Sequence, residues 1–340
     1  MTSAFDALEA LPRFRLLGGP SPLHRLERFS EALGGRAEIW VKREDLLPLA
    51  FGGNKLRNLE FLLGAALAAG ADTLVTAGRR WSNHCRLTAA AGARAGLGVH
   101  LVLSGPPVLG PDGREAANPG RVLDELLGAT VHQLATADRA EREAAMGRIA
   151  DEVRAAGGRP YVIPVGGSGL PGAAGQVLAG AELVAQAAAA GVTFDAVVVP
   201  SATGGTQAGV LAGLRAAGST AEVVGILAAR PAADLRPVIE ATLAALEPIL
   251  GIAVDPAEIV LEPGWLGGGY GVRSTAAEEA TRLLARTEGI LVDPIHTAKA
   301  LAGLAGLVRA GRWDGRRVVF WHAGGTPGLF EPLDGEAAPS

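Results

Sequence analysis

The chain has few of the features that mark secreted, membrane or nucleic-acid-binding proteins. Cys85 is the only cysteine among 340 residues, so no disulfide can form within the chain, and a reducing cytoplasm fits this composition. The longest apolar runs, such as residues 187–192, are too short to span a bilayer, and residues 1–15 lack the apolar core of a secretory signal. The 31 lysines and arginines are outnumbered by 35 aspartates and glutamates, so nothing indicates a basic face for nucleic acid. We expect a cytoplasmic protein that binds neither membranes nor nucleic acids.

Strand-like and helix-like segments alternate along almost the whole sequence, which indicates parallel βαβ units. At 340 residues the chain is long enough for two domains. Alanine-rich helices are expected between the strands, for example at residues 140–155 and 172–190. Residues 105–121, rich in proline, glycine and aspartate, are predicted to form a loop that borders the active site, and the tail after Pro332 to be frayed. The expected strands are residues 37–45, 73–76, 99–103, 130–134, 161–164, 196–199, 222–227 and 317–321.

One glycine-rich turn is notable because it ends in a lysine. Gly52, Gly53 and Asn54 precede Lys55, and the apolar periodicity that follows predicts a helix beginning at or just after this lysine. A lysine is a useful nucleophile only when its amine loses its proton near neutral pH, which requires a partly desolvated site or a nearby cation. A tight turn can fix such a side chain against a ligand. Taken alone, the pattern is more typical of a surface lysine at a helix start.

A second motif, far along the chain, changes that interpretation. Residues 196–199 form a β-branched apolar run typical of a buried parallel strand, and a loop of small residues and a helix follow. At a helix N-terminus the N–H groups and the helix dipole attract an anion, and the hydroxyls of Thr203 and Thr206 add donors. The loop has neither a Walker ending nor the dinucleotide spacing of glycines, so a small monophosphate fits better. For this segment alone, a βα turn without a ligand remains the alternative.

Two features together indicate pyridoxal 5′-phosphate, which needs both: a lysine that can form an imine, and a loop that can bind a phosphate. With these residues the chain resembles the fold type II (tryptophan-synthase-β-like) pyridoxal-phosphate enzymes. Among them it is similar to the 1-aminocyclopropane-1-carboxylate deaminase / D-cysteine desulfhydrase family, over nearly its whole length. The motifs that carry the resemblance are Lys42-Arg43-Glu44-Asp45, Gly52-Gly53-Asn54-Lys55, Ser82-Asn83-His84, Ile163-Pro164-Val165-Gly166-Gly167-Ser168, Gly204-Gly205-Thr206, Tyr270-Gly271, Asp293-Pro294 and His322-Ala323-Gly324-Gly325-Thr326-Pro327-Gly328-Leu329-Phe330.

The resemblance implies an α/β fold of two domains, built on mainly parallel sheets flanked by helices. Residues 1–55 and 166–340 would form the larger, cofactor-binding domain, and residues 56–165 a smaller α/β domain inserted into it. The cofactor would lie between the two, at the carboxyl ends of the strands. The family also implies a homodimer that acts on a small amino acid. No metal site is predicted.

Within this resemblance, Lys55 would hold the cofactor and, once displaced by the substrate amine, act as the base in proton transfer. Ser82 matches the serine near the substrate carboxylate, and Asn83 the asparagine beside the 3′-oxygen of the cofactor. A Ser-Asn pair is also an ordinary helix N-cap, and the two roles are compatible. The phosphate-binding loop is matched by Ala202, Thr203, Gly204, Gly205 and Thr206. The family often has Gly-Ser where this chain has Ala-Thr, and a threonine hydroxyl can replace that of serine.

Residues 270–297 distinguish activities within the family. Tyr270 occupies the place of one of the two active-site tyrosines of the deaminase, but His296 stands where the second would be. Thr297 stands where the deaminase has a glutamate facing the pyridine nitrogen, and where desulfhydrases have threonine. A carboxylate keeps that nitrogen protonated and favours a long-lived carbanion, whereas a hydroxyl leaves it neutral. These residues argue against cyclopropane ring opening and for β-elimination of a good leaving group.

A second departure from the family lies at Arg79, Arg80 and Trp81, directly before the Ser-Asn pair. Relatives usually have small or apolar residues and a glutamine there. Two arginines and a tryptophan at the substrate loop would recognise a second anionic group through charge-assisted hydrogen bonds. His84, next to the Ser-Asn pair, is assigned to substrate binding. The alternative is that one or both arginines face solvent. His296 likewise is either a proton donor near neutral pH or a ring packed against the cofactor.

The function predicted from the sequence is that of a pyridoxal-phosphate-dependent carbon–sulfur lyase or deaminase. It would remove a β-substituent and ammonia from a small amino acid, as a D-cysteine desulfhydrase or a cysteate sulfo-lyase does, and leave a 2-oxo acid. Three alternatives stay open. They are 1-aminocyclopropane-1-carboxylate deamination, a β-replacement or racemisation variant of natural-product metabolism, and a non-catalytic protein that binds the cofactor or an amino acid.

Overall fold

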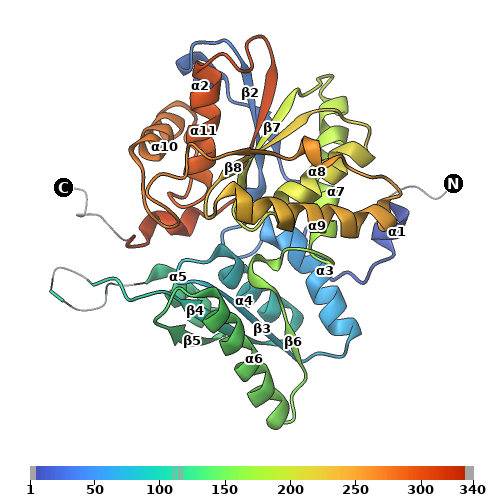
Figure 1. Ribbon diagram of the computed structural model, residues 1–340, viewed down its shortest axis with the longest axis vertical. Coiled ribbons are helices and arrows are strands. Elements are labelled where there is room, and N and C mark those ends of the chain that lie inside the picture. The colour runs from blue at the N-terminus through green and yellow to red at the C-terminus, as the bar shows by residue number, and fades with distance from the viewer. Residues whose placement is uncertain (1–4, 110–111, 114–115, 117, 334–340) are drawn as a thin grey trace.

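The computed structural model describes residues 5–109, 112–113, 116 and 118–333, which form two lobes, each with its own sheet (Figure 1). The larger lobe contains a six-stranded sheet and the smaller lobe a four-stranded one. In order of neighbours, the larger sheet comprises β1 (Leu23–Arg25), β2 (Glu38–Arg43), β10 (Arg317–His322), β7 (Ala196–Ser201), β8 (Glu222–Leu227) and β9 (Val260–Glu262). The smaller sheet comprises β5 (Thr130–Leu134), β4 (Gly98–Ser104), β3 (Thr73–Arg79) and β6 (Pro160–Val162).

The strands are parallel almost throughout, which confirms the predicted α/β class. Within the described residues, β1 with β2 is the single antiparallel pair. The two strands that the sequence did not predict, β1 and β9, are edge strands of three residues each. Segments this short show no measurable alternation of apolar and polar residues, so periodicity cannot detect them.

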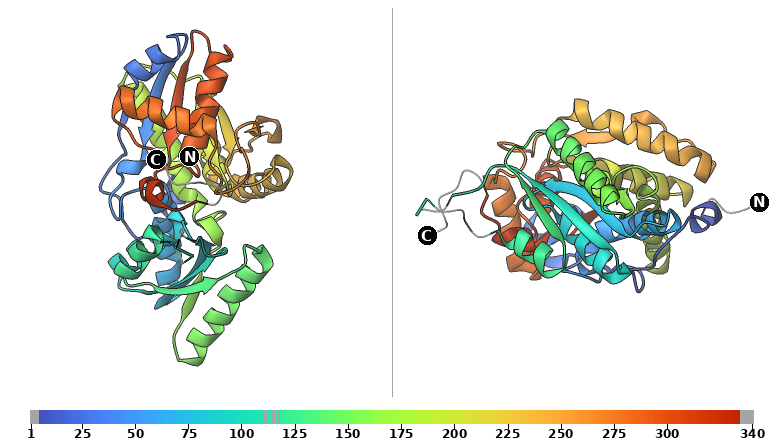
Figure 2. Two further views of the ribbon diagram at one scale, coloured as in Figure 1. Left: turned by 90° about the vertical axis from the view of Figure 1, so that its left-hand side faces the viewer. Right: turned by 90° about the horizontal axis from the view of Figure 1, so that it is seen from below.

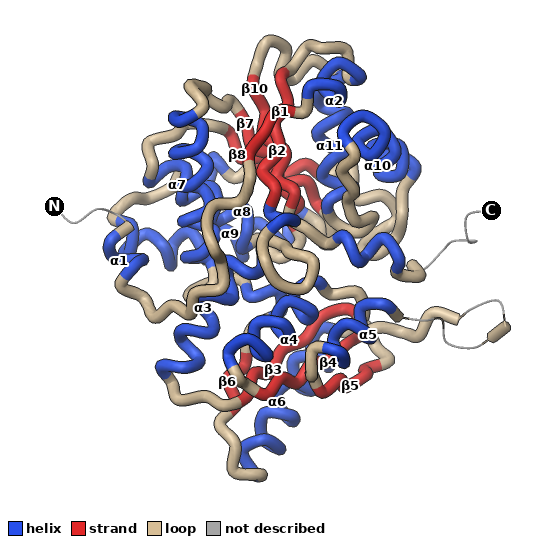
Figure 3. Tube along the Cα trace, turned by 180° about the vertical axis from the view of Figure 1, so that it is seen from behind, coloured by secondary structure: helices blue, strands red, loops and turns tan. Residues whose placement is uncertain are grey.

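The larger sheet is covered by helices on both faces, as the unbroken apolar sequence of β7 predicts (Figures 1 and 3). Val197 and Val199 pack with α7 (Ala173–Ala189), α8 (Gly205–Ala216), α9 (Ala232–Leu250) and α1 (Asp6–Glu9). Ala196 and Val198 pack in the opposite layer, with α2 (Glu27–Ala32), α10 (Thr275–Glu288) and α11 (Thr297–Arg309). Successive residues of a strand point to opposite faces, so one apolar run supplies both cores.

The smaller sheet follows the same rule. Leu74 and Leu101 pack against α3 (Lys55–Ala68) and α4 (Asn83–Ala95). Val75 and Val102, one residue further along each strand, pack against α6 (Arg139–Ala155) on the other face. Figure 2 shows α6 across the smaller sheet from α4. The remaining helix, α5 (Pro119–Leu126), lies beside β5 and α4.

The order of the elements along the chain determines where the strand ends meet. All four strands of the smaller sheet lie within residues 73–162, whereas β1 and β2 precede them and β7 to β10 follow. The residues at the carboxyl ends of β3, β7 and β10 line one cavity. Parallel sheets commonly bind ligands at this edge. The domain limits at residues 56 and 165 stay a prediction.

Most of the predicted helices and strands are found in the structure. The helices expected at residues 140–155 and 172–190 correspond to α6 and α7. The loop predicted at residues 105–121 ends three residues early, because α5 begins at Pro119. Parts of that loop (110–111, 114–115 and 117), and residues 334–340 of the tail, lie outside the described residues. Within residues that the structure describes, no helix combines the length and apolar character needed to cross a membrane.

Candidate active site

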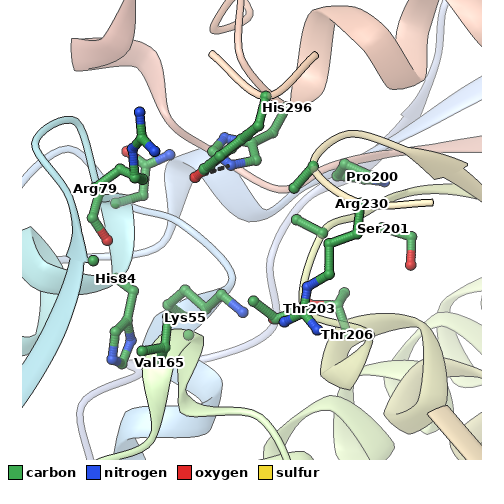
Figure 4. A pocket seen from close by; sticks show the side chains of 18 of the residues that line it. Lys55, Arg79, His84, Val165, Pro200, Ser201, Thr203, Thr206, Arg230 and His296 are labelled. Carbon is green, nitrogen blue, oxygen red and sulfur yellow. Dashed lines mark hydrogen bonds between the residues drawn. The ribbon is translucent and has the colours of Figure 1, made fainter. Parts of the chain in front are cut away.

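A cavity of about 720 Å³ lies between the two lobes (Figure 4). Its walls come from the carboxyl ends of β3, β7 and β10 and from the first residues of α3, α4, α8 and α11. The arrangement brings together residues that are far apart in the sequence, from Asn54 to Gly324. Of the site residues predicted from the sequence, the lining includes Lys55, Arg79, Ser82, Asn83, His84, Ala202, Thr203, Gly204, Thr206, Tyr270, His296 and Thr297.

Lys55 is the first residue of α3, as predicted, and the turn before it fixes its position. Gly52 has a φ of 65°, and a β-carbon there would lie 2.1 Å from the carbonyl oxygen of Asp45, so this turn requires glycine. The Asn54 side chain donates to Oγ1 of Thr206 at 2.8 Å, which ties the turn to the opposite wall of the cavity. Burial lowers the pKa of the Lys55 amine to about 8, so free amine is available near neutral pH.

The two other lysines of the chain are engaged elsewhere. Lys42 is fully buried and forms an ion pair with Glu182. The Lys299 amine donates to the carbonyl oxygens of Leu266, at 2.8 Å, and Gly269, at 2.6 Å. Burial also lowers the pKa of Lys299 to about 8, so a low pKa does not by itself distinguish the lysines. Their positions do, because neither Lys42 nor Lys299 lines the cavity.

The loop between β7 and α8 forms the wall opposite the lysine. Gly204 has a φ of 84°, and a β-carbon there would lie 2.9 Å from Cγ1 of Ile239, so conformation and space both require glycine. Thr203 accepts a hydrogen bond from Oγ of Ser168 at 2.7 Å. Since α8 begins at the next residue after Gly204, its unpaired N–H groups and positive dipole end lie beside the cavity. Figure 4 shows the Lys55 amine directed toward Thr203.

The N-terminus of α4 supplies a second edge suited to an anion. Ser82 caps this helix, because its Oγ accepts a hydrogen bond from the Cys85 N–H at 3.2 Å, and the predicted capping role is confirmed. Oδ1 of Asn83 accepts from Nη2 of Arg86 at 3.1 Å, which leaves the amide N–H₂ group as the donor for a ligand. Cys85 itself is fully buried, and burial raises its pKa, as expected for a small core residue.

His84 presents an unpartnered nitrogen in the cavity wall. Its Nε2 lies 2.9 Å from Oγ1 of Thr76, and that hydroxyl donates its own proton to the carbonyl oxygen of Ile163 at 2.9 Å. Nε2 must therefore carry the proton of the neutral ring. Burial, with the nearby Lys55 cation, lowers the pKa of His84 to about 3, which keeps the ring neutral. Nδ1 is then a buried acceptor that has no hydrogen-bond partner within the described residues.

Asp293 organises the side of the cavity that faces these groups. It is fully buried and accepts hydrogen bonds from the backbone N–H groups of His296 and Thr297, each at 2.9 Å, and from the Thr297 hydroxyl. Burial alone would raise the pKa of Asp293, but the hydrogen bonds from His296 and Thr297 hold it below its usual value. The charged carboxylate lies 3.2 Å from Nδ1 of His296, whose Nε2 lies 3.3 Å from the Tyr270 hydroxyl. A carboxylate, an imidazole and a phenol thus form one chain that reaches the cavity.

Tyr270 keeps its proton throughout the ordinary pH range. Burial raises its pKa to about 12, so the hydroxyl keeps its proton and can donate it in a hydrogen bond to Nε2 of His296. The sequence left two roles for His296, a proton donor or a packed ring. The structure shows a hydrogen-bonded imidazole whose ring also packs at 5.6 Å from that of Tyr270.

Three residues predicted for the site do not line the cavity. Arg80 is 1% exposed and donates to the carbonyl oxygen of Pro106 at 2.9 Å. It follows the last residue of β3, and successive side chains of an extended segment point in opposite directions, so Arg79 and Arg80 cannot both face the cavity. Trp81 packs edge-on against Tyr270, with ring centroids 6.0 Å apart, and supports the wall from behind. Gly205 is buried behind the loop as the first residue of α8.

Sequence reasoning missed three arginines that line the cavity, namely Arg139, Arg142 and Arg230. Figure 4 shows Arg230 extending from the end of β8 toward Thr203. Burial lowers the pKa of Arg142 and of Arg230, and each is also repelled by neighbouring arginines. One signal was available for Arg230, because it follows a predicted parallel strand at the edge where ligands bind. Arg142 lies within a helix, and no local motif marks it.

Comparisons with known proteins agree with this geometry. A family model described as pyridoxal-phosphate dependent enzyme matches residues 14–324. The D-cysteine desulfhydrase of Yersinia pestis (strain Pestoides F) is 42% identical over 325 residues, which are 95% of this chain and 96% of that protein. A crystal structure described as an ACC deaminase homologue is 33% identical, with a TM-score of 0.88 and coverage of 97% of both chains. Threonine deaminase isoform 2 of Solanum lycopersicum, 18% identical with a TM-score of 0.64, shares the fold over 95% of this chain and 83% of its own.

Proposed function

Because the chain belongs to the pyridoxal-phosphate-dependent enzymes, with pyridoxal 5′-phosphate as its cofactor, we propose that it is a lyase that removes a β-substituent and ammonia from a small amino acid. D-Cysteine is the first candidate substrate, since relatives that are 42% identical carry the name D-cysteine desulfhydrase. The observation that carries the proposal is the placement of Lys55, whose pKa is lowered to about 8, across one cavity from the loop at the start of α8.

The cavity residues fit this cofactor. Lys55 supplies the amine that binds its aldehyde, and the N-terminus of α8 with Thr203 and Thr206 supplies donors for its phosphate. A β-carbon at Gly204 would clash with Ile239, so this position requires glycine. Without a side chain at this position, the backbone of the loop is open to a bound phosphate. Arg230 adds a positive charge beside the loop. When bound, the cofactor withdraws electrons from the substrate Cα and so allows a proton to leave there.

The chain's own residues then divide the work of elimination. Lys55, displaced from the cofactor by the substrate amine, receives the Cα proton on Nζ. Ser82 and Asn83, at the N-terminus of α4, bind the substrate carboxylate. The Cβ–S bond breaks, and the leaving sulfur takes a proton from the Tyr270–His296 pair. With D-cysteine and one water, the products are pyruvate, ammonia and hydrogen sulfide, so that all atoms balance.

Asp293 acts in this scheme as a positioning residue. It holds the proton of His296 on Nδ1 and directs Nε2 at the Tyr270 hydroxyl. With its proton on Nδ1, His296 has none on Nε2 to return, so a proton lost from Tyr270 to the leaving group is replaced from water. The Thr297 hydroxyl donates to the same carboxylate, so this position offers the cofactor ring a neutral oxygen, in contrast to a glutamate.

The proposal is tested by measuring 2-oxo-acid release from the purified holoenzyme with a panel of substrates. The panel contains D- and L-cysteine, D- and L-3-chloroalanine, cysteate and 1-aminocyclopropane-1-carboxylate. We expect pyruvate from the β-substituted amino acids without any added nucleophile. Pyruvate that appears only with an added nucleophile would indicate replacement, and loss of optical activity without oxo acid would indicate racemisation. Failure of every substrate, with cofactor bound, would contradict a catalytic role.

The same panel tests a narrower prediction about 1-aminocyclopropane-1-carboxylate. His296 and Thr297 replace the tyrosine and glutamate of the deaminases, so we expect little or no release of 2-oxobutanoate. Ring opening needs a strongly stabilised carbanion, which a neutral hydroxyl supports less well than a carboxylate does. Efficient release of 2-oxobutanoate and ammonia from this compound would contradict the assignment.

We also propose that the chain acts as a homodimer in the cytoplasm. The support is its likeness to the D-cysteine desulfhydrase family over 95% of its length. Light scattering on the purified holoenzyme tests the assembly, and a molar mass of one chain at micromolar concentration would contradict it. Fractionation of the producing cells tests the compartment.

A further inference from the structure

Arg79 and Arg142 converge on the carboxyl end of β4, in the small-lobe wall of the cavity. Arg79 ends β3, where it is paired in register with Ser104 of the neighbouring strand. Arg142, near the start of α6, donates from Nη1 to Oγ of the same Ser104 at 3.1 Å. Gly105 follows, and a β-carbon there would lie 3.4 Å from Nε and Nη2 of Arg79. Because Ser104 and Gly105 are both small, the guanidinium groups of Arg79 and Arg142 can both lie against this end of β4.

These two cations are not neutralised by protein groups. Within the described residues, neither Arg79 nor Arg142 forms an ion pair with a carboxylate, and Nε of each is buried without a hydrogen-bond partner. The Arg79 guanidinium lies 5.1 Å from the ring centre of Trp81 and 5.9 Å from that of Tyr270, contacts that hold it without cancelling its charge. Burying an unpaired charge is costly, so an anion is expected to complete this wall.

The other anions of the proposed reaction have sites of their own. The cofactor phosphate is assigned to the start of α8, and the α-carboxylate of the substrate to Ser82 and Asn83 at the start of α4. Arg79 and Arg142 remain, and they lie beside Tyr270, the residue assigned to the leaving group. Arg139, the next cation along α6, pairs with Glu143 and is two-thirds exposed, so it is not part of this cluster.

We propose that Arg79 and Arg142 form a subsite for a second anionic group on the substrate side chain, a sulfonate or a carboxylate carried on or beyond the β-carbon. This inference rests on the proposed function, because it names a class of β-substituted amino acid, besides D-cysteine, that the same cavity accepts. It assigns the role that the sequence suggested for Arg79 and Arg80 to Arg79 and Arg142. The cause is the placement of α6 over the end of β4, which brings Arg142 into the position that Arg80 cannot reach.

The first test compares kcat/KM for cysteate with kcat/KM for 3-chloroalanine of the same configuration. We expect the wild-type holoenzyme to prefer the anionic substrate, and Arg142→Ala to lower the ratio of the two constants by roughly ten- to hundredfold. Arg142→Lys should restore part of the ratio, since it keeps the charge but not the fork of donors. Arg148→Ala, an exposed position on the same helix, is the control and should leave the ratio unchanged. A ratio that Arg142→Ala and Arg79→Ala both leave unchanged would overturn the subsite.

The second test measures binding without turnover, so that it still decides if no substrate reacts. The visible absorbance of the bound cofactor is titrated with succinate, with 3-sulfopropionate and with butyrate, which lacks the second charge. We expect one or both dianions to bind at least tenfold more tightly than butyrate, and Arg142→Ala to remove the difference. Comparison of the two dianions identifies the preferred group. Equal binding of all three compounds would overturn the subsite even if elimination is observed, whereas dianion selectivity without any turnover would overturn only the proposed function.

Discussion

The two walls of the cavity differ in how completely the protein satisfies its own polar groups. On the large-lobe wall, the hydroxyls of Thr203 and Thr206 are held by Ser168 and Asn54. On the small-lobe wall, by contrast, buried nitrogens of Arg79, Arg142 and His84 have no partner within the described residues. A wall whose threonine side chains are already fixed by the protein, and which offers the N–H groups of the α8 N-terminus, suits a group that is always the same, such as a cofactor phosphate. A wall with open donors and acceptors suits the substrate, and differences in specificity between relatives are expected to lie there.

The largest effect on turnover is expected from removal of Lys55, the lysine that lies between the two walls. Lys55→Ala should lower turnover by roughly a thousandfold or more, because the base that moves the Cα proton is lost. Lys55→Arg is the matched variant, since it keeps a positive charge at this position but cannot bind the cofactor aldehyde. It should be equally inactive in the oxo-acid assay. Full activity in either variant would show that another group performs these steps.

The next largest effect is expected for the residues that supply a proton to the leaving group. His296→Gln removes the imidazole from the chain formed by Asp293 and Tyr270, so kcat for D-cysteine should fall by about a hundredfold. Chloride leaves without needing a proton, so kcat for 3-chloroalanine should change by only a few-fold. The ratio of these two effects distinguishes proton donation from simple packing. An equal loss with both substrates would mean that His296 merely shapes the wall.

A smaller effect, on cofactor affinity, is expected from a substitution that strains the phosphate-binding loop but removes none of its hydrogen bonds. Gly204→Ala puts a β-carbon at a φ of 84° and against Ile239. The strain is about 1–3 kcal/mol, which should weaken cofactor binding roughly ten- to hundredfold in a fluorescence titration of the apoprotein. Gly218→Ala is the control, because that glycine has a φ of 79° but no atom within 4 Å of the added carbon. It should lower the Tm and leave cofactor affinity unchanged, and a matching loss of affinity would contradict a local role for Gly204.

The smallest effect concerns the pH dependence of cofactor capture. The reactive form of Lys55 is the free amine, whose fraction rises with pH until the pKa of about 8 is passed. The rate of appearance of the visible cofactor band, after apoprotein and cofactor are mixed, should therefore rise between pH 6 and pH 8 and then level off. An ordinary lysine, with a pKa of about 10.4, would continue to gain reactivity up to pH 10. A rate that still rises tenfold between pH 8 and pH 9 would show that burial does not lower this pKa.

Sequence patterns were sufficient for the phosphate-binding loop of the large-lobe wall, although not for Arg230, because the parts of this loop are contiguous. A strand, a glycine-rich loop and a helix follow one another within residues 196–216, and each has its own local signature. The same holds for the turn before Lys55 and for the cap at Ser82. These elements follow from backbone conformation and hydrophobic periodicity, which are properties of short segments.

The pairing of Arg79 with Arg142 in the small-lobe wall could not be predicted in the same way, because these two residues meet only after the helices pack. Arg142 reaches the cavity through the position of α6, and Arg80 is excluded by the direction in which an extended segment turns its side chains. The link from Asn54 to Thr206 spans 152 positions and has no local signal. Even Asp293, noted in the sequence only as a landmark, acquires its role from the buried contacts of its carboxylate.

The central claim is that Lys55, and not another lysine, holds the cofactor between the two walls. The chain offers only two rivals, Lys42 and Lys299, and burial lowers the pKa of Lys299 to the same value of about 8. Reduction of the holoenzyme with borohydride, followed by digestion and mass spectrometry, identifies the modified lysine directly. The account predicts a pyridoxyl adduct on the peptide that contains Lys55, with Lys42 and Lys299 unmodified. An adduct on either of those two residues would contradict it.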